Sequence, residues 1–188
     1  MRINIKWILF ISLLVLLTVA YKIFLGPDVN WSGFSPVMAI AVFSGMIIKR
    51  KNSSFLLPLL ALLVSDIIIE ILFKADLFDY EGFYAGQWKN YGLILTATLI
   101  GWGLRGRSRQ NLLAGAIAAP TVYFFLSNTM VWMSSVALYT KDFSGLMNCY
   151  TAGLPFYRNS LIATIVFLPL IMVAYNYIIQ QRRRLTLA

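Results

Sequence analysis

Two acidic side chains lie within an apolar stretch that is long enough to cross a membrane. Residues 55–73 read FLLPLLALLVSDIIIEILF, and these 19 residues would extend roughly 28 Å as an α-helix, about the thickness of a bilayer's hydrocarbon core. Asp66 and Glu70 are four residues apart and share one helix face. A carboxylate at that depth costs on the order of 2.5–3.5 kcal/mol, so we expect this face to look into the protein. There the acids could bind a cationic or hydrogen-bonding substrate, relay a proton, or pair with a cation at the outer rim such as Lys74, Lys89 or Arg158.

The remaining residue types limit the chemistry. The chain has no histidine and a single cysteine, Cys149, which excludes the usual Ser-His-Asp and Cys-His hydrolases and any histidine-bearing metal site. It has no Gly-rich phosphate loop ending in Gly-Lys-Ser/Thr, so it is not expected to hydrolyse ATP by itself. Asp66 and Glu70 could act as an acid–base pair, but no partner nucleophile is recognisable. We therefore expect a binding protein and not an enzyme.

The composition is that of a membrane protein. Hydrophobic residues make up 60% of the chain and charged residues 12%, which leaves too little polar surface for a soluble globule. The apolar runs predict an all-α, polytopic protein with a single transmembrane domain over residues 1–188 and six spans, at about 7–24, 34–48, 55–73, 91–104, 111–133 and 160–179. The first span is interpreted as a membrane helix and not as a cleaved signal peptide, because it is long for a signal peptide.

Basic residues gather on one side of the predicted spans. Eleven of the sixteen Lys and Arg residues fall on the face that also holds both termini: Arg2, Lys6, Lys49, Arg50, Lys51, Arg105, Arg107, Arg109, Arg182, Arg183 and Arg184. The seven acidic residues fall in the opposite loops or within the third span. The positive-inside rule makes the basic face cytoplasmic, with both termini inside. The basic runs are thus interpreted as topology determinants, and the net charge of +9 is not taken to indicate nucleic-acid binding.

Two predicted spans are short, and their outer ends meet aromatic loops. From Pro36 onwards the second span reaches only about 20 Å, so residues 30–35 are expected to dip into the membrane against protein. Short spans often mark the place where substrate enters a transporter, and the loops predicted at 74–90 and 134–159 are rich in aromatic residues. On the fifth span, Phe124, Asn128 and Trp132 share one face, which could line a cavity. The alternatives are an interfacial aromatic belt and, for Asn128, hydrogen bonding between helices.

The order of several short motifs resembles known transporters. The loop NWSGFSP at 30–36, the small-residue span MAIAVFSG at 38–45, a basic turn, and Leu57-Pro58 leading to Ser65-Asp66 resemble the S components of energy-coupling-factor vitamin transporters, over roughly residues 25–75. Over nearly the whole chain the sequence is similar to an uncharacterised bacterial membrane family described as transport proteins. Its later signatures match Ser127-Asn128, Trp132, Gly145-Leu146 and Leu154-Pro155-Phe156.

The resemblance implies a six-helix, S-component-like bundle in the bacterial inner membrane. Such a bundle captures a vitamin or cofactor precursor from the outer side, beneath loops that act as a lid, and needs no other cofactor. The substrate-binding residues would come from the 30–36 loop, the outer part of the third span, the fifth span and the aromatic loops. They are Asn30, Trp31, Phe34, Ser35, Asp66, Glu70, Tyr84, Trp88, Asn128, Trp132, Tyr150, Phe156 and Asn159.

The expected partners are the lipid bilayer, the small-molecule substrate and a coupling membrane protein with ATPases. S components dock on that partner through an Ala-x-x-x-Ala pattern in their first helix, which is missing here, so the chain could also work alone. Small residues that permit close helix packing occur instead at Ala41 and Gly45 and at Ala114 and Ala118.

Two further readings stay open. Some solitary relatives handle cobalamin through a cysteine near the metal, which would make Cys149 a cobalt ligand instead of an inert thiol. The alternative function is a non-transporting membrane scaffold of the cell-shape (MreD-like) type, which resembles the same bundle and needs no ligand.

Overall fold

The computed structural model describes residues 5–106, 108–134 and 138–180. Within these ranges the chain forms helices and no strand, as the sequence predicts. The helices are α1 (Ile5–Phe24), α2 (Val37–Ile47), α3 (Lys51–Lys74), α4 (Gln87–Gly103), α5 (Arg109–Met133) and α6 (Phe143–Ile178), with a short 3-10 helix, η1 (Val29–Trp31), between α1 and α2. Of the predicted basic face, Arg2, Arg107 and Arg182–Arg184 lie outside the described residues.

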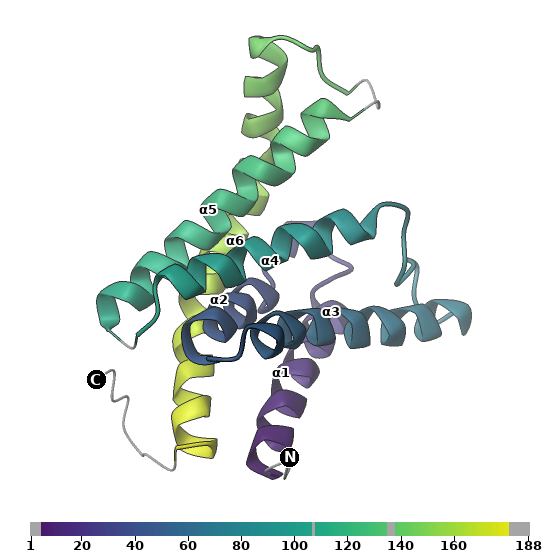
Figure 1. Ribbon diagram of the computed structural model, residues 1–188. Coiled ribbons are helices and arrows are strands. Elements are labelled where there is room, and N and C mark those ends of the chain that lie inside the picture. Colours follow the sequence, from purple (N-terminus) through teal and green to yellow (C-terminus); the bar gives the residue numbers. More distant parts are fainter. Residues whose placement is uncertain (1–4, 107, 135–137, 181–188) are drawn as a thin grey trace.

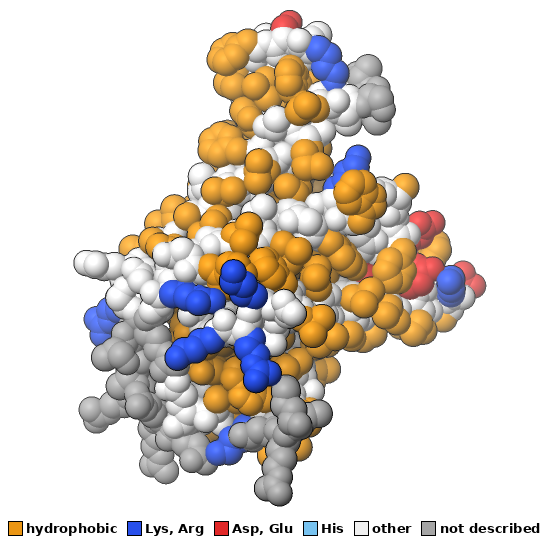
Figure 2. Space-filling model, viewed as in Figure 1, with side chains coloured by type: hydrophobic (Ala, Val, Ile, Leu, Met, Phe, Trp, Pro, Cys, Tyr) orange, Lys and Arg blue, Asp and Glu red, His pale blue; other side chains and the backbone are white. Residues whose placement is uncertain are grey.

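Four helices, α1, α3, α5 and α6, are long and apolar enough to cross a membrane. The protein is therefore an α-helical, membrane-embedded protein. Helix α2 has only 11 residues and α4 has 17, so both are short, as expected. Figure 2 shows most of the visible Lys and Arg side chains in the lower half of this face, and the visible acidic side chains at the upper tip and the right-hand end.

Helix α2 forms the centre of the bundle. All residues from Val37 to Met46 are buried, and the helix packs against α3, α4 and α6. Its crossing with α4 depends on two glycines that face each other. A Cβ atom added at Gly45 would lie 2.1 Å from the Thr98 carbonyl oxygen, and one at Gly101 would lie 2.3 Å from the Val42 carbonyl oxygen. Only glycine lets the two backbones approach this closely, and the crossing fixes the position of α4.

Helix α5 and the first part of α6 extend together as an arm, seen at the top of Figure 1. This arm corrects the predicted loop at 134–159, because α6 begins at Phe143 and not near residue 160. The Asp142 carboxylate caps the helix by accepting a hydrogen bond from the Gly145 amide at 2.7 Å. Gly145, Cys149 and Gly153 then recur every fourth residue as a buried stripe, and α6 packs along α5. Four of the aromatic residues expected in that loop are thus carried by a helix: Phe143, Tyr150, Phe156 and Tyr157.

The other boundaries differ by a few residues from the prediction. Helix α4 begins at Gln87 and not at Tyr91, so the loop before it covers only residues 75–86. Helix α3 already begins at Lys51, one turn before the predicted start. In the 30–36 loop, Asn30 and Trp31 are exposed and residues 32–35 are half-buried.

Candidate functional site

A cavity of about 700 Å³ lies between the helix ends that point away from the turns at 48–50 and 104–108. Its walls come from all six helices and from the loops at 25–36 and 75–86. Five of the predicted binding residues line it: Ser35, Asp66, Tyr84, Asn128 and Phe156. The short helices α2 and α4 both contribute their first turns to the wall. The volume is within the range of small-molecule sites in proteins.

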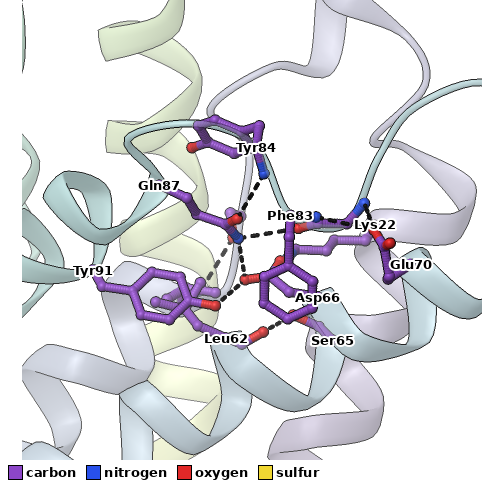
Figure 3. Close-up of polar contacts among 12 residues, drawn as sticks. Lys22, Leu62, Ser65, Asp66, Glu70, Phe83, Tyr84, Gln87 and Tyr91 are labelled. Atoms are coloured by element: carbon purple, nitrogen blue, oxygen red, sulfur yellow. Dashed lines mark hydrogen bonds and ion pairs between the residues drawn. The ribbon is translucent and has the colours of Figure 1, made fainter.

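Asp66 is the buried centre of a polar network on one wall, and only 3% of its surface is exposed. Its Oδ1 atom forms an ion pair with the Lys22 ammonium, which comes from the last turns of α1. Its Oδ2 atom accepts hydrogen bonds from Gln87 Nε2 at 2.5 Å and from the Tyr91 hydroxyl. Figure 3 shows these side chains converging on the carboxylate from α1 and α4. Asp66 therefore joins three helices, and both of its oxygens are occupied.

Gln87 connects the same network to the loop at 75–86. Its Nε2 atom also donates to the Gly82 carbonyl oxygen at 3.1 Å, and its Oε1 atom accepts from the Tyr84 amide at 3.1 Å. On the other side, the Tyr80 hydroxyl donates to the Lys22 carbonyl oxygen at 2.7 Å. The 75–86 loop, which exposes Phe83 and Tyr84, is thus held over the cavity by buried and part-buried hydrogen bonds.

Glu70 does not line the cavity. Its carboxylate pairs with Lys74 at 3.0 Å and accepts the Gly82 and Phe83 amides at 3.2 and 3.3 Å. Gly82 lies so close to α3 that a Cβ atom there would be 2.1 Å from the Asp66 carbonyl oxygen. Glu70 therefore anchors the 75–86 loop, and the predicted pairing with Lys74 is present for this acid and not for Asp66.

The part of the wall formed by α5, α6 and Asn90 of α4 is aromatic and carries amide groups. The Tyr123 hydroxyl on α5 donates to Asn90 Oδ1 on α4 and so bridges two helices of the wall. Asn128 donates its Nδ2 hydrogen to the Phe124 carbonyl oxygen at 2.8 Å, one turn earlier on its own helix. The Phe124 and Tyr157 rings pack with their centres 5.0 Å apart.

Burial raises the pKa of the loop phenols Tyr80 and Tyr84 above the ordinary value, so both remain neutral at physiological pH.

Besides Glu70, seven other predicted binding residues do not line the cavity. Asn159 donates from Nδ2 to the carbonyl oxygens of Asn30 and Ser32, at 2.7 and 3.0 Å, and so ties the 30–36 loop to α6. Trp31 and Phe34 pack on each other, with ring centres 5.3 Å apart. The others sit at or near the surface of the arm or the α4 end: Trp88, which is 74% exposed, Trp132, which bonds the Thr140 carbonyl oxygen, and Tyr150, which bonds Thr129.

Cys149 and the small-residue pairs lie elsewhere in the bundle. The Cys149 thiol is 2% exposed and donates to the Asn128 carbonyl oxygen at 3.3 Å, behind the cavity wall. Among the described residues, no cluster of three or more His, Cys, Asp or Glu side chains is placed to hold a metal ion. Ala41 and Gly45 are buried inside the chain's own bundle, whereas Ala114 is exposed and Ala118 is half-buried on the outside of α5.

Sequence reasoning missed four important members of the site: Lys22, Gln87, Tyr91 and Tyr123. Lys22 could have been found, because it is the only charged residue within the predicted span 7–24, and a cation inside a span usually has a buried partner. Gln87 and Tyr91 lie one turn apart and so face the same way once α4 begins at Gln87. Tyr123 carried no signal that distinguished it from the neighbouring aromatic residues.

Comparison with known proteins gives one family. Residues 2–186 match the model of a family of unknown function, DUF6580. No curated protein and no solved structure matches the chain at a significant level.

Proposed function

The chain belongs to the DUF6580 family, whose function is unknown, and we propose that it is a membrane subunit that binds a small molecule for uptake. The observation that carries this proposal is the cavity of about 700 Å³, which is lined by all six described α-helices and has an ion pair between Lys22 and the buried Asp66 in its wall. A partly open hollow of this volume is of the size that small molecules occupy in proteins. Aromatic walls with a few fixed polar groups are typical of ligand sites.

The proposed substrate is a vitamin or a related cofactor precursor that enters from the outer side, as in S components. The cavity lies at the bundle end away from the basic turns, which under the positive-inside rule is the outer end. Loops 25–36 and 75–86 contribute to its wall and would control access. The outward-facing Ala114 and Ala118 on α5 offer small residues to a coupling protein.

Ligand binding is tested on the purified protein by native mass spectrometry and thermal shift against a vitamin library. We expect at least one compound to stabilise the protein, and Asn128→Ala to weaken that stabilisation because Asn128 lines the cavity. The matched control is Asn148→Ala, which removes an exposed amide from α6. If no compound stabilises the protein and none co-purifies with it, the proposal fails and the non-transporting scaffold becomes the better reading.

We further propose six spans with both termini in the cytoplasm. In a Cys149→Ser background, a cysteine introduced at Leu77, in the exposed 75–86 loop, should react with an impermeant maleimide added to intact spheroplasts. A cysteine at Ser53, in the first turn of α3, should react only after the membrane is opened. The reverse pattern would invert the topology and place the cavity on the cytoplasmic side.

A further inference from the structure

The charge of Asp66 in the cavity wall is compensated by Lys22. Among the described residues, three charged side chains line the cavity, and two of them, the half-buried Lys22 and the buried Asp66, form an ion pair in its wall. Asp66 has no free oxygen, since Oδ1 faces Lys22 and Oδ2 accepts from Gln87 and Tyr91. The third, Glu81, is an exposed residue of the 75–86 loop at the cavity's edge. A bound molecule therefore finds no unpaired charge in the depth of the cavity.

Two further charged side chains, Glu70 and Arg158, lie outside the lining; the first is paired and the second is exposed. Glu70 is held by Lys74 and by two backbone amides. Arg158 is exposed on α6 and does not belong to the lining. Neither group offers a charge to a molecule inside.

What remains is a neutral wall rich in aromatic rings. Six tyrosines line the cavity, from α1, the 75–86 loop, α4, α5 and α6: Tyr21, Tyr80, Tyr84, Tyr91, Tyr123 and Tyr157. Phe124 and Phe156 add two further rings. Aromatic side chains on facing walls favour flat molecules, which pack against ring faces over a large area. The Asn128 amide and the serine hydroxyls of the lining supply uncharged hydrogen-bonding groups for the edge of such a molecule.

We propose that the cavity selects an uncharged, planar, ring-containing molecule with hydrogen-bonding groups along its edge. This inference rests on the proposed binding function and names its substrate class. A carboxylate, a phosphate or an ammonium group in the ligand would have to separate Lys22 from Asp66 or remain without a counter-ion against a mostly apolar wall, and both are unfavourable. The Lys22–Asp66 pair thus acts as a neutral structural clamp and excludes charged molecules.

The inference is tested with three probes that share one ring system and differ in charge. These are a quinoline carboxamide, the matching quinoline carboxylate and the N-methylated quinolinium carboxamide, with affinity measured by thermal shift and by isothermal titration in detergent. We expect the neutral amide to bind at least about tenfold more tightly than either ion, a difference of about one logarithmic unit in Kd. If these probes are too small to bind, the charge of whichever compound in the vitamin library binds decides the same question.

Changing the pair gives a readout that misfolding cannot imitate. Lys22→Met leaves the Asp66 carboxylate unpaired and should shift the preference toward the cation, whereas Asp66→Asn leaves the ammonium and should shift it toward the anion. The double variant removes both charges and should again prefer the neutral probe, even where a single variant folds poorly. A wild-type protein that prefers a charged compound overturns this inference and leaves the binding function standing. Single variants that bind ligand with no change in charge preference overturn it as well, whereas a protein that binds no compound of any charge overturns both proposals.

Discussion

Replacing Gly101 by alanine should push α4 away from α2, because there is no room for a methyl group at their crossing. The added Cβ atom would lie 2.3 Å from the Val42 carbonyl oxygen and 3.1 Å from the Gly45 Cα atom. To bring the first contact to even 3.0 Å, the two backbones must separate by at least 0.7 Å (3.0 minus 2.3). Overpacking of this kind costs about 1–3 kcal/mol. Both neighbours are backbone atoms within helices, which cannot rotate away as a side chain could.

Gly103 provides a matched control on the same helix, two residues further along. No atom lies within 4 Å of a Cβ atom added there, so Gly103→Ala should be neutral or stabilise α4 by up to about 1 kcal/mol through helix propensity. The free energy of unfolding of the two variants should therefore differ by about 1–4 kcal/mol. It is measured by reversible unfolding in mixed detergent–SDS micelles, followed by circular dichroism. Equal stabilities would refute the close α2–α4 contact and, with it, the position of Gln87 and Tyr91 on the cavity wall.

Three further predictions follow from single hydrogen-bonded groups. Asn159→Ala should cost about 1–3 kcal/mol and speed proteolysis of the 25–35 segment, because two carbonyl oxygens of that loop lose their donor, whereas Asn148→Ala should change neither. The Gly145 amide and the Thr140 hydroxyl hold the pKa of Asp142 below its usual range. The stabilisation of the α6 N-terminus is then complete above the unfolded-state pKa and is lost as the pH falls through the folded-state value. Hydrogen exchange of the first α6 turn should thus show an acid transition that Asp142→Asn abolishes, and no such transition would refute the cap. Cys149 should react with maleimide only after SDS denaturation, since its thiol is buried, and rapid labelling of the folded protein would contradict the arm's packing.

The sequence predicted the helical segments that are predominantly apolar and missed the first half of α6, whose composition is mixed. Residues 55–73 and 111–133 lie inside α3 and α5, because predominantly apolar runs of this length leave helix as the structure that satisfies the backbone in a membrane. Residues 143–159 contain asparagine, serine, proline, arginine and several aromatics, and their composition resembles a loop. The informative signal was the spacing of Gly145, Cys149 and Gly153, together with a capping aspartate, and not hydropathy.

For the site, burial of Asp66 in a cavity wall was predictable, but its partners were not. The cost of an acid at membrane depth required an inward orientation, and the structure places Asp66 there. The expected partners Lys74, Lys89 and Arg158 are cations near the predicted outer rim. Lys22 lies 44 residues before Asp66 in the chain, and only the packing of α1 against α3 brings the two together. A single sequence contains no information on that pairing of helices.

The helical arm changes which parts of the protein can open the cavity. Tyr157 and Phe156 belong to a helix packed along α5, so they form a fixed wall and cannot act as a lid. Access then depends on the 25–36 and 75–86 loops. The first is held by Asn159 and the second by Glu70 and Gln87, each through hydrogen bonds to loop backbone atoms. Opening by either loop must therefore break a small, identifiable set of hydrogen bonds. Because Gln87 also donates to Asp66, movement of the 75–86 loop is coupled to the Lys22–Asp66 ion pair. A ligand that displaces this loop would therefore also change the environment of Lys22.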